Sequence, residues 1–344
     1  MKRTLNIIMG VAIFLSLAGA AWAANCGGGV PCSCGNTVNA NTVLDDGFDS
    51  VVSTGPAEFC PGSGLTVNAG VTLNLGGKTI RGNRIGNGVT INGDNAVVTN
   101  GTIRGFNVGL STAKDGGTIS KIKALRNKTD GIQVLSVGQN NLLLSNQATE
   151  NGVGGTGDGI SIAGDDNTLK SNKANSNAGI GINLLFSATG NLLDKNTAEE
   201  NSEDGIKVAG GVVGDGNTLT SNKASSNRGN GINVSSDGNT LTKNTANENF
   251  ASGIFVDTTA DSNTLEGNKA DKNSGTGVSV NGKLNSLTKN SAKQNDGDGV
   301  FAKKQTTDKN IDLGGNKGTD NGGVGNDGLD GEKNCEIDEE LCLP

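Results

Sequence analysis

Carboxylates are the side chains of this sequence that could do chemistry. An aspartate stands before a Gly and two apolar residues at several points, as at Asp130, Asp158 and Asp204. If the segments that carry Asp130 and Asp158 stack, their carboxyl groups lie about 5 Å apart, the separation found in retaining glycosidases. Asp-Gly is also a favourable turn sequence, and no set of Arg and Lys accompanies these aspartates. They are therefore candidate catalytic groups, with turn formation as the plainer explanation.

A second group of carboxylates near the C-terminal end could bind calcium. Residues 322–330 read GGVGNDGLD and match the nonapeptide G-G-x-G-x-D-x-U-x, whose repeats hold Ca²⁺ between neighbouring coils. The ligands would be Asp320, Asp327 and Asp330, and calcium is the only cofactor that the sequence suggests. Only one copy of the motif is present, so an ordinary Asp- and Gly-rich loop is the simpler interpretation.

The first 23 residues have the features of a secretory signal peptide. Two basic residues precede an apolar stretch from Ile7 to Leu17, and the cleavage sequence AWA follows at 21–23. The stretch is short for a membrane helix, so we expect an exported protein with no membrane span in its mature chain, extracellular, on the cell surface or in the periplasm. Loss of Lys2 and Arg3 moves the formal charge from −7 to −9, which disfavours nucleic acid as a partner. No part of the sequence predicts an oligomeric state.

The cysteines flank the regular part of the chain, four before it and two after it. An even number of cysteines in an exported protein favours disulfides. We expect two bridges in the N-terminal group, with Cys34–Cys60 as the preferred long one, and a third between Cys335 and Cys342. A metal site at residues 32–34 is the alternative, although an oxidising compartment would pair these thiols. The six residues are Cys26, Cys32, Cys34, Cys60, Cys335 and Cys342.

A repeat of 22 to 26 residues provides the elements that must position these side chains. In each repeat, a leucine stands three residues before an asparagine, from Leu143 to Leu313, and another asparagine follows five residues later. Upstream lies a pair of apolar residues at i and i+2, such as Ile206 and Val208, which is the period of a β-strand. The first asparagine column is Asn146, Asn172, Asn196, Asn222, Asn244, Asn268 and Asn290, continuing at Asn316.

One such unit cannot bury its own apolar side, so the units must stack into a parallel β-helix. We expect an all-β, single-stranded solenoid of ten to eleven coils over residues 65–321, with disulfide-stabilised ends. A cysteine-rich cap at 24–64 precedes it, and an Asp- and Gly-rich loop with a cysteine cap at 322–344 follows it. The asparagines are expected to turn the corners in left-handed backbone and to hydrogen-bond to the asparagines one coil away.

These repeats resemble those of the pectate-lyase-like right-handed parallel β-helix proteins, and in particular the NosD-like group. The unit D-G-I-x-V…N-x-L-x-x-N-x-A-x-x-N, as at residues 204–227, carries the resemblance, together with GVTLNLGGKTIR at 70–81 and NGTIRGF at 100–106. The resemblance covers roughly residues 65 to 321 and implies that the coil is right-handed. Its motifs are specific for the fold and weak for an activity.

The resemblance also implies catalytic sets that this chain lacks. Polygalacturonase-like members use a Gly-His-Gly segment and alginate epimerases use His or Tyr, but the chain contains neither residue type. A pectate-lyase-like mechanism, with Arg or Lys as base and Asp-bound calcium, fits the composition, but Arg228 has no acidic cluster of the right kind. A NosD-like role in copper-site assembly lacks ligands, because the mature chain has no His or Met.

We therefore expect an exported, non-catalytic protein that acts at the cell surface or on extracellular polysaccharide. The alternatives are a polysaccharide lyase or hydrolase, and a NosD-like maturation factor for a periplasmic metalloenzyme. Loops of varying length at 209–216, 257–262 and 303–309 are a candidate binding rim or simple length drift. The few phenylalanines, such as Phe186, Phe250, Phe255 and Phe301, are expected in the core or in loops.

Overall fold

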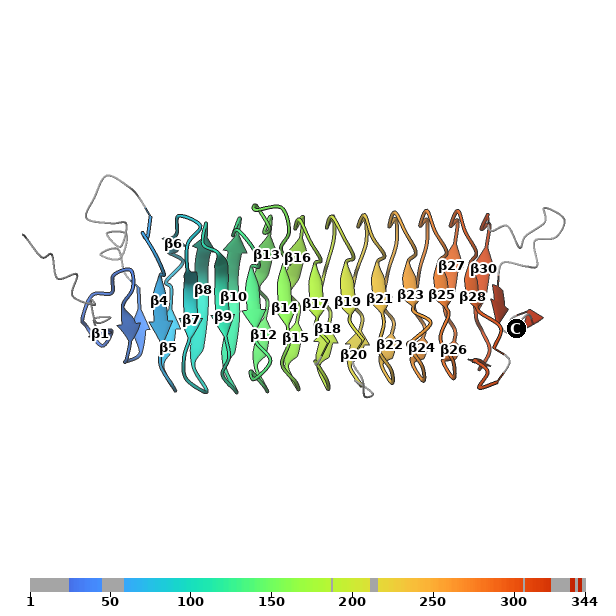
Figure 1. Cartoon of the computed structure of the whole chain (residues 1–344), viewed down its shortest axis with the longest axis horizontal. Helices are drawn as coiled ribbons and strands as arrows, with labels where there is room; N and C mark the ends of the chain where they lie inside the picture. The colour runs from blue at the N-terminus through green and yellow to red at the C-terminus, as the bar shows by residue number, and fades with distance from the viewer. Residues whose placement is uncertain are drawn as a thin grey trace, which may run out of the picture.

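The described part of the chain is a long solenoid of β-strands and turns. The computed structural model describes residues 25–44, 59–186, 188–210, 216–305, 307–322, 335–337 and 340–341, so the predicted signal peptide lies outside it. The coils stack along one axis (Figure 1), forming a right-handed parallel β-helix of about ten turns. None of the residues described belongs to a helix that could cross a membrane. The predicted fold class is confirmed.

Three sheets form the three sides of the coil, and the first is the longest. We call it sheet 1; its strands pair in parallel except at its last pair. They are β1 (Asn25–Cys26), β2 (Thr37–Val38), β4 (Leu65–Val67), β7 (Asn87–Ile91), β9 (Val108–Thr112), β11 (Ile132–Val134), β14 (Ile160–Ile162), β17 (Ile182–Leu184), β19 (Ile206–Val208), β21 (Ile232–Val234), β23 (Ile254–Val256), β25 (Val278–Val280), β28 (Val300–Ala302), β31 (Cys335–Ile337) and β32 (Glu340–Leu341).

Sheet 2 carries the leucine column, and sheet 3 the alanine column. Sheet 2 contains β3 (Thr42–Val43), β5 (Thr72–Asn74), β8 (Val97–Arg104), β10 (Thr118–Leu125), β12 (Leu142–Leu144), β15 (Thr168–Lys170), β18 (Leu192–Asp194), β20 (Thr218–Thr220), β22 (Thr240–Thr242), β24 (Thr264–Glu266), β26 (Ser286–Thr288) and β29 (Ile311–Asp312). Sheet 3 contains β6 (Thr79–Arg81), β13 (Gln147–Thr149), β16 (Lys173–Asn175), β27 (Ser291–Lys293), β30 (Lys317–Thr319) and the second halves of β8 and β10, and single-residue bridges join β16 to β27.

Registered stacking builds the core from identical columns. The i, i+2 pairs of sheet 1 lie directly above one another, as in Ile182, Ile206 and Ile232, and all three are fully buried. Leu193 and Leu219 pair in the same way in sheet 2. Each strand therefore buries its apolar residues and turns the residue between them outward.

Buried asparagines hold the corners together in three ladders. At Asn196, Oδ1 accepts hydrogen bonds from the backbone N and the Nδ2 of Asn172, at 2.9 and 3.0 Å. Its Nδ2 donates to the backbone O of Leu169 at 2.8 Å and to Oδ1 of Asn222 at 3.0 Å. The predicted amide-to-amide bonds are thus confirmed. The ladder that starts at Asn141 was not foreseen from the sequence; its members are Asn141, Asn167, Asn191, Asn217, Asn239, Asn263, Asn285 and Asn310.

The expectation that the ladder asparagines adopt left-handed backbone is wrong. In nearly every coil the residue before the asparagine has the positive φ, for example Lys195 at 56° and Ser221 at 56°, whereas before Asn310 it is Asp308, two residues earlier. That residue makes the bend, and the next one then points into the coil. Burial of the amide, and not tolerance of positive φ, explains why asparagine recurs there.

The last leucine of the predicted column also departs from expectation. Asn310 keeps Ile311 opposite Ser286, so Asp312 and not Leu313 lies opposite Leu287. Asn316 stands six positions after Asn310, whereas Asn290 stands five positions after Asn285. The extra residue turns Leu313 outward, and its side chain is 62% exposed.

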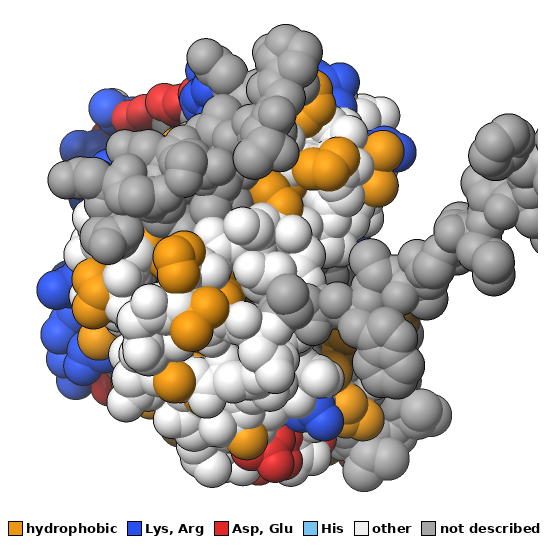
Figure 2. All heavy atoms as spheres, turned by 90° about the vertical axis from the view of Figure 1, so that its left-hand side faces the viewer, with side chains coloured by type: hydrophobic (Ala, Val, Ile, Leu, Met, Phe, Trp, Pro, Cys, Tyr) orange, Lys and Arg blue, Asp and Glu red, His pale blue; other side chains and the backbone are white. Residues whose placement is uncertain are grey.

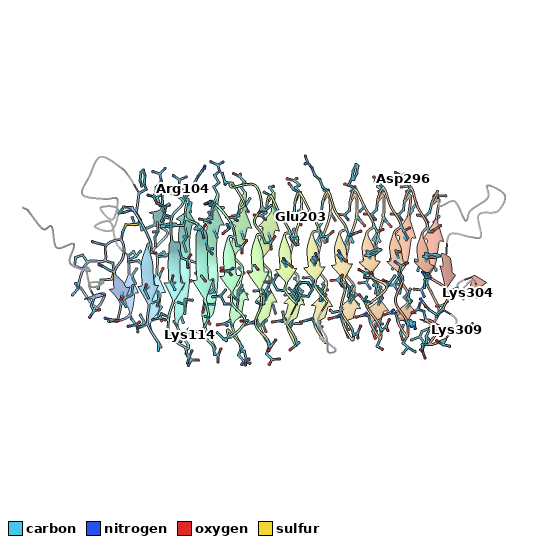
Figure 3. The ribbon with its side chains drawn as sticks, viewed as in Figure 1. Arg104, Lys114, Glu203, Asp296, Lys304 and Lys309 are labelled. Atoms are coloured by element: carbon cyan, nitrogen blue, oxygen red, sulfur yellow. A yellow bond between two sulfur atoms is a disulfide. The ribbon has the colours of Figure 1, made fainter. Side chains whose placement is uncertain are left out.

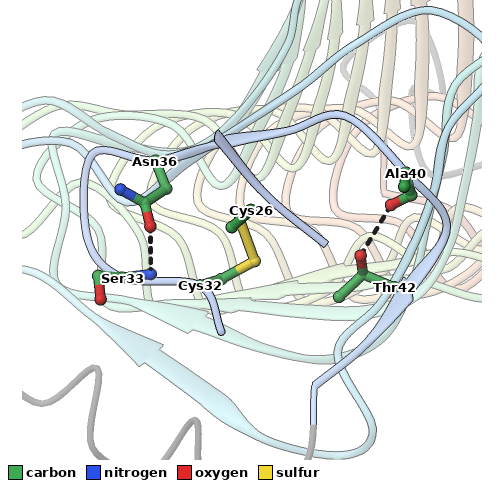
Figure 4. Close-up of a disulfide and its surroundings, with 6 residues drawn as sticks. All are labelled: Cys26, Cys32, Ser33, Asn36, Ala40 and Thr42. Carbon is green, nitrogen blue, oxygen red and sulfur yellow. Dashed lines mark hydrogen bonds between the residues drawn. A yellow bond between two sulfur atoms is a disulfide. The ribbon is translucent and has the colours of Figure 1, made fainter. Parts of the chain in front are cut away.

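The N-terminal end is closed by two disulfides, as predicted. Cys34 bonds to Cys60, and Cys26 to Cys32, beside turns held by Ser33 N donating to Asn36 Oδ1 and Thr42 Oγ1 donating to Ala40 O (Figure 4). The predicted Cys335–Cys342 bridge lies outside the described side chains. At that end, β31 stacks in parallel on β28, and β32 pairs with β31 in antiparallel fashion.

Removing one ladder amide should destabilise the solenoid strongly. Asn196→Ala removes the partner of the buried backbone N of Asn172 and the side-chain donor to the backbone O of Leu169, so we expect the free energy of unfolding to fall by about 3 kcal/mol or more. Urea unfolding followed by circular dichroism measures this. The matched control is Thr197→Ala on the outer side of the same coil, with an expected change below about 0.5 kcal/mol. Equal effects of the two substitutions would contradict the role of the ladder.

Candidate functional site

The candidate site lies on the outer face of sheet 1, where the middle residue of each apolar pair points outward. These residues pair in register from coil to coil, and we call them the sheet 1 row. Sequence reasoning missed the row, although the residue between two inward ones was a signal that could have identified it. Its members are Thr66, Thr90, Ser111, Gln133, Ser161, Asn183, Lys207, Asn233, Phe255, Ser279 and Phe301.

The structure brings Asp130 and Asp158 together beside this row. Oδ1 of Asp130 accepts a hydrogen bond from the backbone N of Asp158 at 2.9 Å. Oδ1 of Asp158 accepts in the same way from the backbone N of Ile180 at 2.9 Å, and its Oδ2 accepts from Nδ2 of Asn183 at 2.8 Å. Each carboxyl group therefore points along the solenoid axis to the next coil.

Asp204 has the same arrangement but stands apart from that pair, because Ile180 occupies the equivalent position between Asp158 and Asp204. Its Oδ1 accepts from the backbone N of Asn230 at 2.6 Å, and its Oδ2 accepts from Nδ2 of Asn233 at 2.8 Å. Both oxygens of Asp158 and both of Asp204 are thus engaged in bonds between coils. Of these three aspartates, only Asp130 has a carboxyl oxygen that is weakly held: its Oδ2 lies 3.4 Å from Nε2 of Gln133.

Burial governs the charge of the paired aspartates. The pKa of Asp130 is raised to about 6, mainly by burial and to a smaller extent by the Asp158 charge, and the hydrogen bond from the backbone of Asp158 opposes this shift. Burial also raises the pKa of Asp158, and the hydrogen bonds from Asn183 and Ile180 and the Lys207 charge oppose this shift. Both carboxyl groups of the pair therefore have a pKa above that of a free aspartate.

Lys207 stands in the row between two asparagines whose acceptor atoms are unused. It pairs in register with Asn183 on one side and Asn233 on the other. The Oδ1 atoms of both asparagines are buried and have no hydrogen-bond partner among the residues described. Lys207 is thus a cation of the row with an amide on either side, and its ammonium group can bind a polar ligand.

Two aromatic rings continue the row beyond the polar part. Phe255 and Phe301 point outward from β23 and β28, with the buried Ser279 between them. They are half-buried, so the expectation that they lie in the core or in loops is wrong for these two. Phe186 and Phe250 are exposed away from the row, at 73% and 75%.

The predicted rim and calcium residues lie elsewhere. Figure 3 shows Lys114 and Lys309 at one long edge and Arg104 and Asp296 at the other; the loop at 303–309 belongs to the first edge. Asp320 is exposed in the turn after β30, whereas Asp327 and Asp330 lie outside the described residues, as do 211–215 and 306 of the rim. Over the part of the chain that is described, no three acidic or cysteine side chains are grouped as metal ligands.

The chain belongs to the right-handed β-helix family, since the family's "Right handed beta helix region" matches residues 60–198 and 188–340. No protein of curated function matches the sequence. Among solved structures, the A-module of mannuronan C-5 epimerase AlgE4 from Azotobacter vinelandii is similar, with a TM-score of 0.50 and 15% identity over 78% of this chain and 88% of the module. The family and fold predicted from the repeats are thus confirmed.

Two further structures have the same fold. The periplasmic alginate epimerase AlgG has a TM-score of 0.55 and 18% identity, covering 75% of this chain and 68% of the epimerase. The Dettilon tailspike protein gp208 also has a TM-score of 0.55, with 15% identity, covering 83% of this chain and 59% of the tailspike. At these identities, the likeness shows the fold alone.

Asp130→Asn should stabilise the protein at neutral pH. The raised pKa means that the folded chain binds this proton more tightly than the unfolded chain, whose aspartate titrates near ~3.9. The ionised carboxylate therefore costs stability above about pH 6, and this cost disappears as the pH falls through 6 toward 4. The amide keeps the acceptor for Asp158 N, so we expect a gain on the order of 1 kcal/mol at neutral pH that shrinks in acid.

Urea unfolding at several pH values measures this gain. Asp165→Asn is the matched control, because Oδ1 of Asp165 also accepts a backbone N–H, from Thr189 at 2.9 Å, at another corner. A gain for Asp130→Asn that did not change with pH would mean that ionisation of this carboxyl group is not its cause.

Proposed function

We propose that this chain is an exported, non-catalytic protein that binds extracellular polysaccharide along the outer face of sheet 1. The observation that carries the proposal is the sheet 1 row, in which hydrogen-bonding groups around Lys207 are followed by Phe255 and Phe301. Disulfides at the N-terminal end support export, to the cell surface, the medium or the periplasm.

The geometry of the row suits a sugar chain that runs along the solenoid. Neighbouring coils are about 4.8 Å apart, so the two rings are separated by roughly 10 Å. In an extended polysaccharide, alternate sugars present the same apolar face at a comparable spacing, and aromatic rings pack against such faces. Hydroxyl groups of sugars beyond the rings would meet Lys207, which lies two coils before Phe255. The fold shared with the alginate epimerase AlgG supports this class of partner.

The bonding of the carboxylates supports a role without catalysis. A nucleophile or general base needs a free oxygen toward the substrate, whereas both oxygens of Asp158 and of Asp204 hold the next coil. The chain also contains no His or Tyr to take over the proton transfer.

A polysaccharide lyase or hydrolase is the second candidate, and Asp130 is the observation that favours it. Its weakly held oxygen and its pKa of about 6 suit a general acid. Incubation of the protein with acidic and neutral polysaccharides distinguishes the two functions. If new double bonds or reducing ends form with the wild-type protein and not with Asp130→Asn, the protein is an enzyme and the non-catalytic function is wrong.

Removal of the two ring platforms should abolish most of the binding. We expect Phe255→Ala/Phe301→Ala to bind its polysaccharide about tenfold more weakly, since each ring contributes of order 0.5–1.5 kcal/mol. Retention of the mature protein on a panel of immobilised neutral and acidic polysaccharides identifies the ligand, and titration calorimetry measures the loss.

Phe186→Ala/Phe250→Ala is the control, because it removes two more exposed rings away from the row. If both double variants lose affinity equally, the binding is unspecific. If the wild-type protein binds none of the polysaccharides, the proposed function is wrong.

A further inference from the structure

Lysines follow the corner between sheets 2 and 3, one in each coil over most of its length. Each stands directly before or directly after an asparagine of the ladder that starts at Asn146, and the side alternates from coil to coil. We call these residues the lysine row. Its members are Lys173, Lys195, Lys223, Lys243, Lys269, Lys289 and Lys317.

Alternation keeps the charges of the row close without placing them face to face. Lys223 lies opposite Thr197 and Thr245 in the bridges of sheet 3, so lysines on the same side are two coils, or roughly 10 Å, apart. Lysines on the opposite side fill the coils between. The row therefore presents one positive charge per coil, about every 4.8 Å, while it avoids directly opposed like charges.

The other two corners carry charges of both signs. At one of them the residue before the ladder asparagine is Glu150, Glu200 or Glu248 in some coils and Arg126 or Lys272 in others; at the other, Asp165 and Asp237 lie two residues before it, and Lys309 lies directly before it. Seen end-on, one group of Lys and Arg side chains lies at the left edge of the molecule, and others lie at the upper left, the upper right and the bottom (Figure 2). In a chain with a net charge of −7, the row is set apart by its regular line of one lysine per coil.

Most members of the row are available to a ligand. Lys223 pairs with Glu199, and Lys269 pairs with Asp271 at 3.0 Å. In contrast, Lys195, Lys243 and Lys289 are exposed and have no ion pair with any residue that the structure describes. These three stand on the same side of the ladder, two coils apart.

A groove lies at the N-terminal start of the row. It has a volume of ≈ 400 Å³, and polar side chains line most of it. Three lysines contribute to it, and hydroxyl and amide groups lie between them: Lys121, Lys123, Ser145, Gln147, Ser171 and Lys173. None of its side chains is aromatic, so nucleic-acid bases would find no stacking platform there.

We propose that the lysine row binds a linear acidic polysaccharide that runs along the solenoid axis, on the side away from sheet 1. A chain with one carboxylate per sugar has a charge spacing close to that of the coils, so successive carboxylates meet successive lysines. The inference takes its class of partner from the proposed function but concerns a different surface. Sheet 1 would contact the apolar faces of the sugars, and the lysine row would bind their carboxylates.

Removal of three lysines from the row tests this proposal. We expect Lys195→Gln/Lys243→Gln/Lys289→Gln to bind polygalacturonate about tenfold more weakly than wild type, with a smaller dependence on salt. The matched control, Lys128→Gln/Lys272→Gln/Lys309→Gln, removes the same charge from exposed positions off the row and should bind nearly as wild type does. Fully methyl-esterified polygalacturonate, which has the same backbone without charge, should not bind through the row.

Several results would overturn the proposal: no binding of polygalacturonate, equal binding of its methyl ester, or equal losses in the two triple variants. If single-stranded DNA binds with the same affinity and the same dependence on the lysines, the ligand of the row is nucleic acid and not polysaccharide. Sedimentation that shows lysine-dependent self-association without ligand would assign the row to a second copy. The proposed function fails separately, because it depends on Phe255 and Phe301, which the lysine variants leave intact.

Discussion

Hydrogen bonding between the buried amides of successive coils is the interaction on which the rest of the structure depends. The interior is narrow, and each coil contributes only a few apolar side chains to it, such as Ile206, Val208 and Leu219. Four hydrogen bonds at an amide such as Asn196 join three coils and satisfy backbone groups that the corner would otherwise leave unpaired. The ladders thereby fix the register, and the register decides which residues share a row on each outer face.

The columns of identical residues made most of the fold predictable from the sequence. Strand period, stacking and the leucine column follow from spacing alone, because a parallel solenoid repeats the environment of each position. Spacing did not reveal which backbone position bends, and it failed at Leu313, where an extra residue displaces the side chain while the hydrogen bond from Asn285 to Asn310 holds the register. Side-chain bonds across coils decided that outcome.

The site was predictable to a smaller extent. Stacking correctly placed Asp130 beside Asp158, because that contact depends only on register. It could not show that Asn183 and Ile180 occupy both oxygens of Asp158, since these bonds depend on side-chain orientation. Phe255 and Phe301 were misplaced for a different reason. An aromatic side chain is usually buried, but a residue between two inward-pointing residues of a strand points outward, and its position in the strand decides the outcome.

The antiparallel pair β31–β32 changes the edge at which sheet 1 ends. A parallel stack can in principle grow without limit, because its last strand offers unpaired backbone groups to the next. β32 runs back along β31 and occupies those groups at the end of sheet 1. A further parallel coil therefore cannot pair with β31, and sheet 1 ends in an antiparallel strand of two residues, which is a short edge for another chain to pair with.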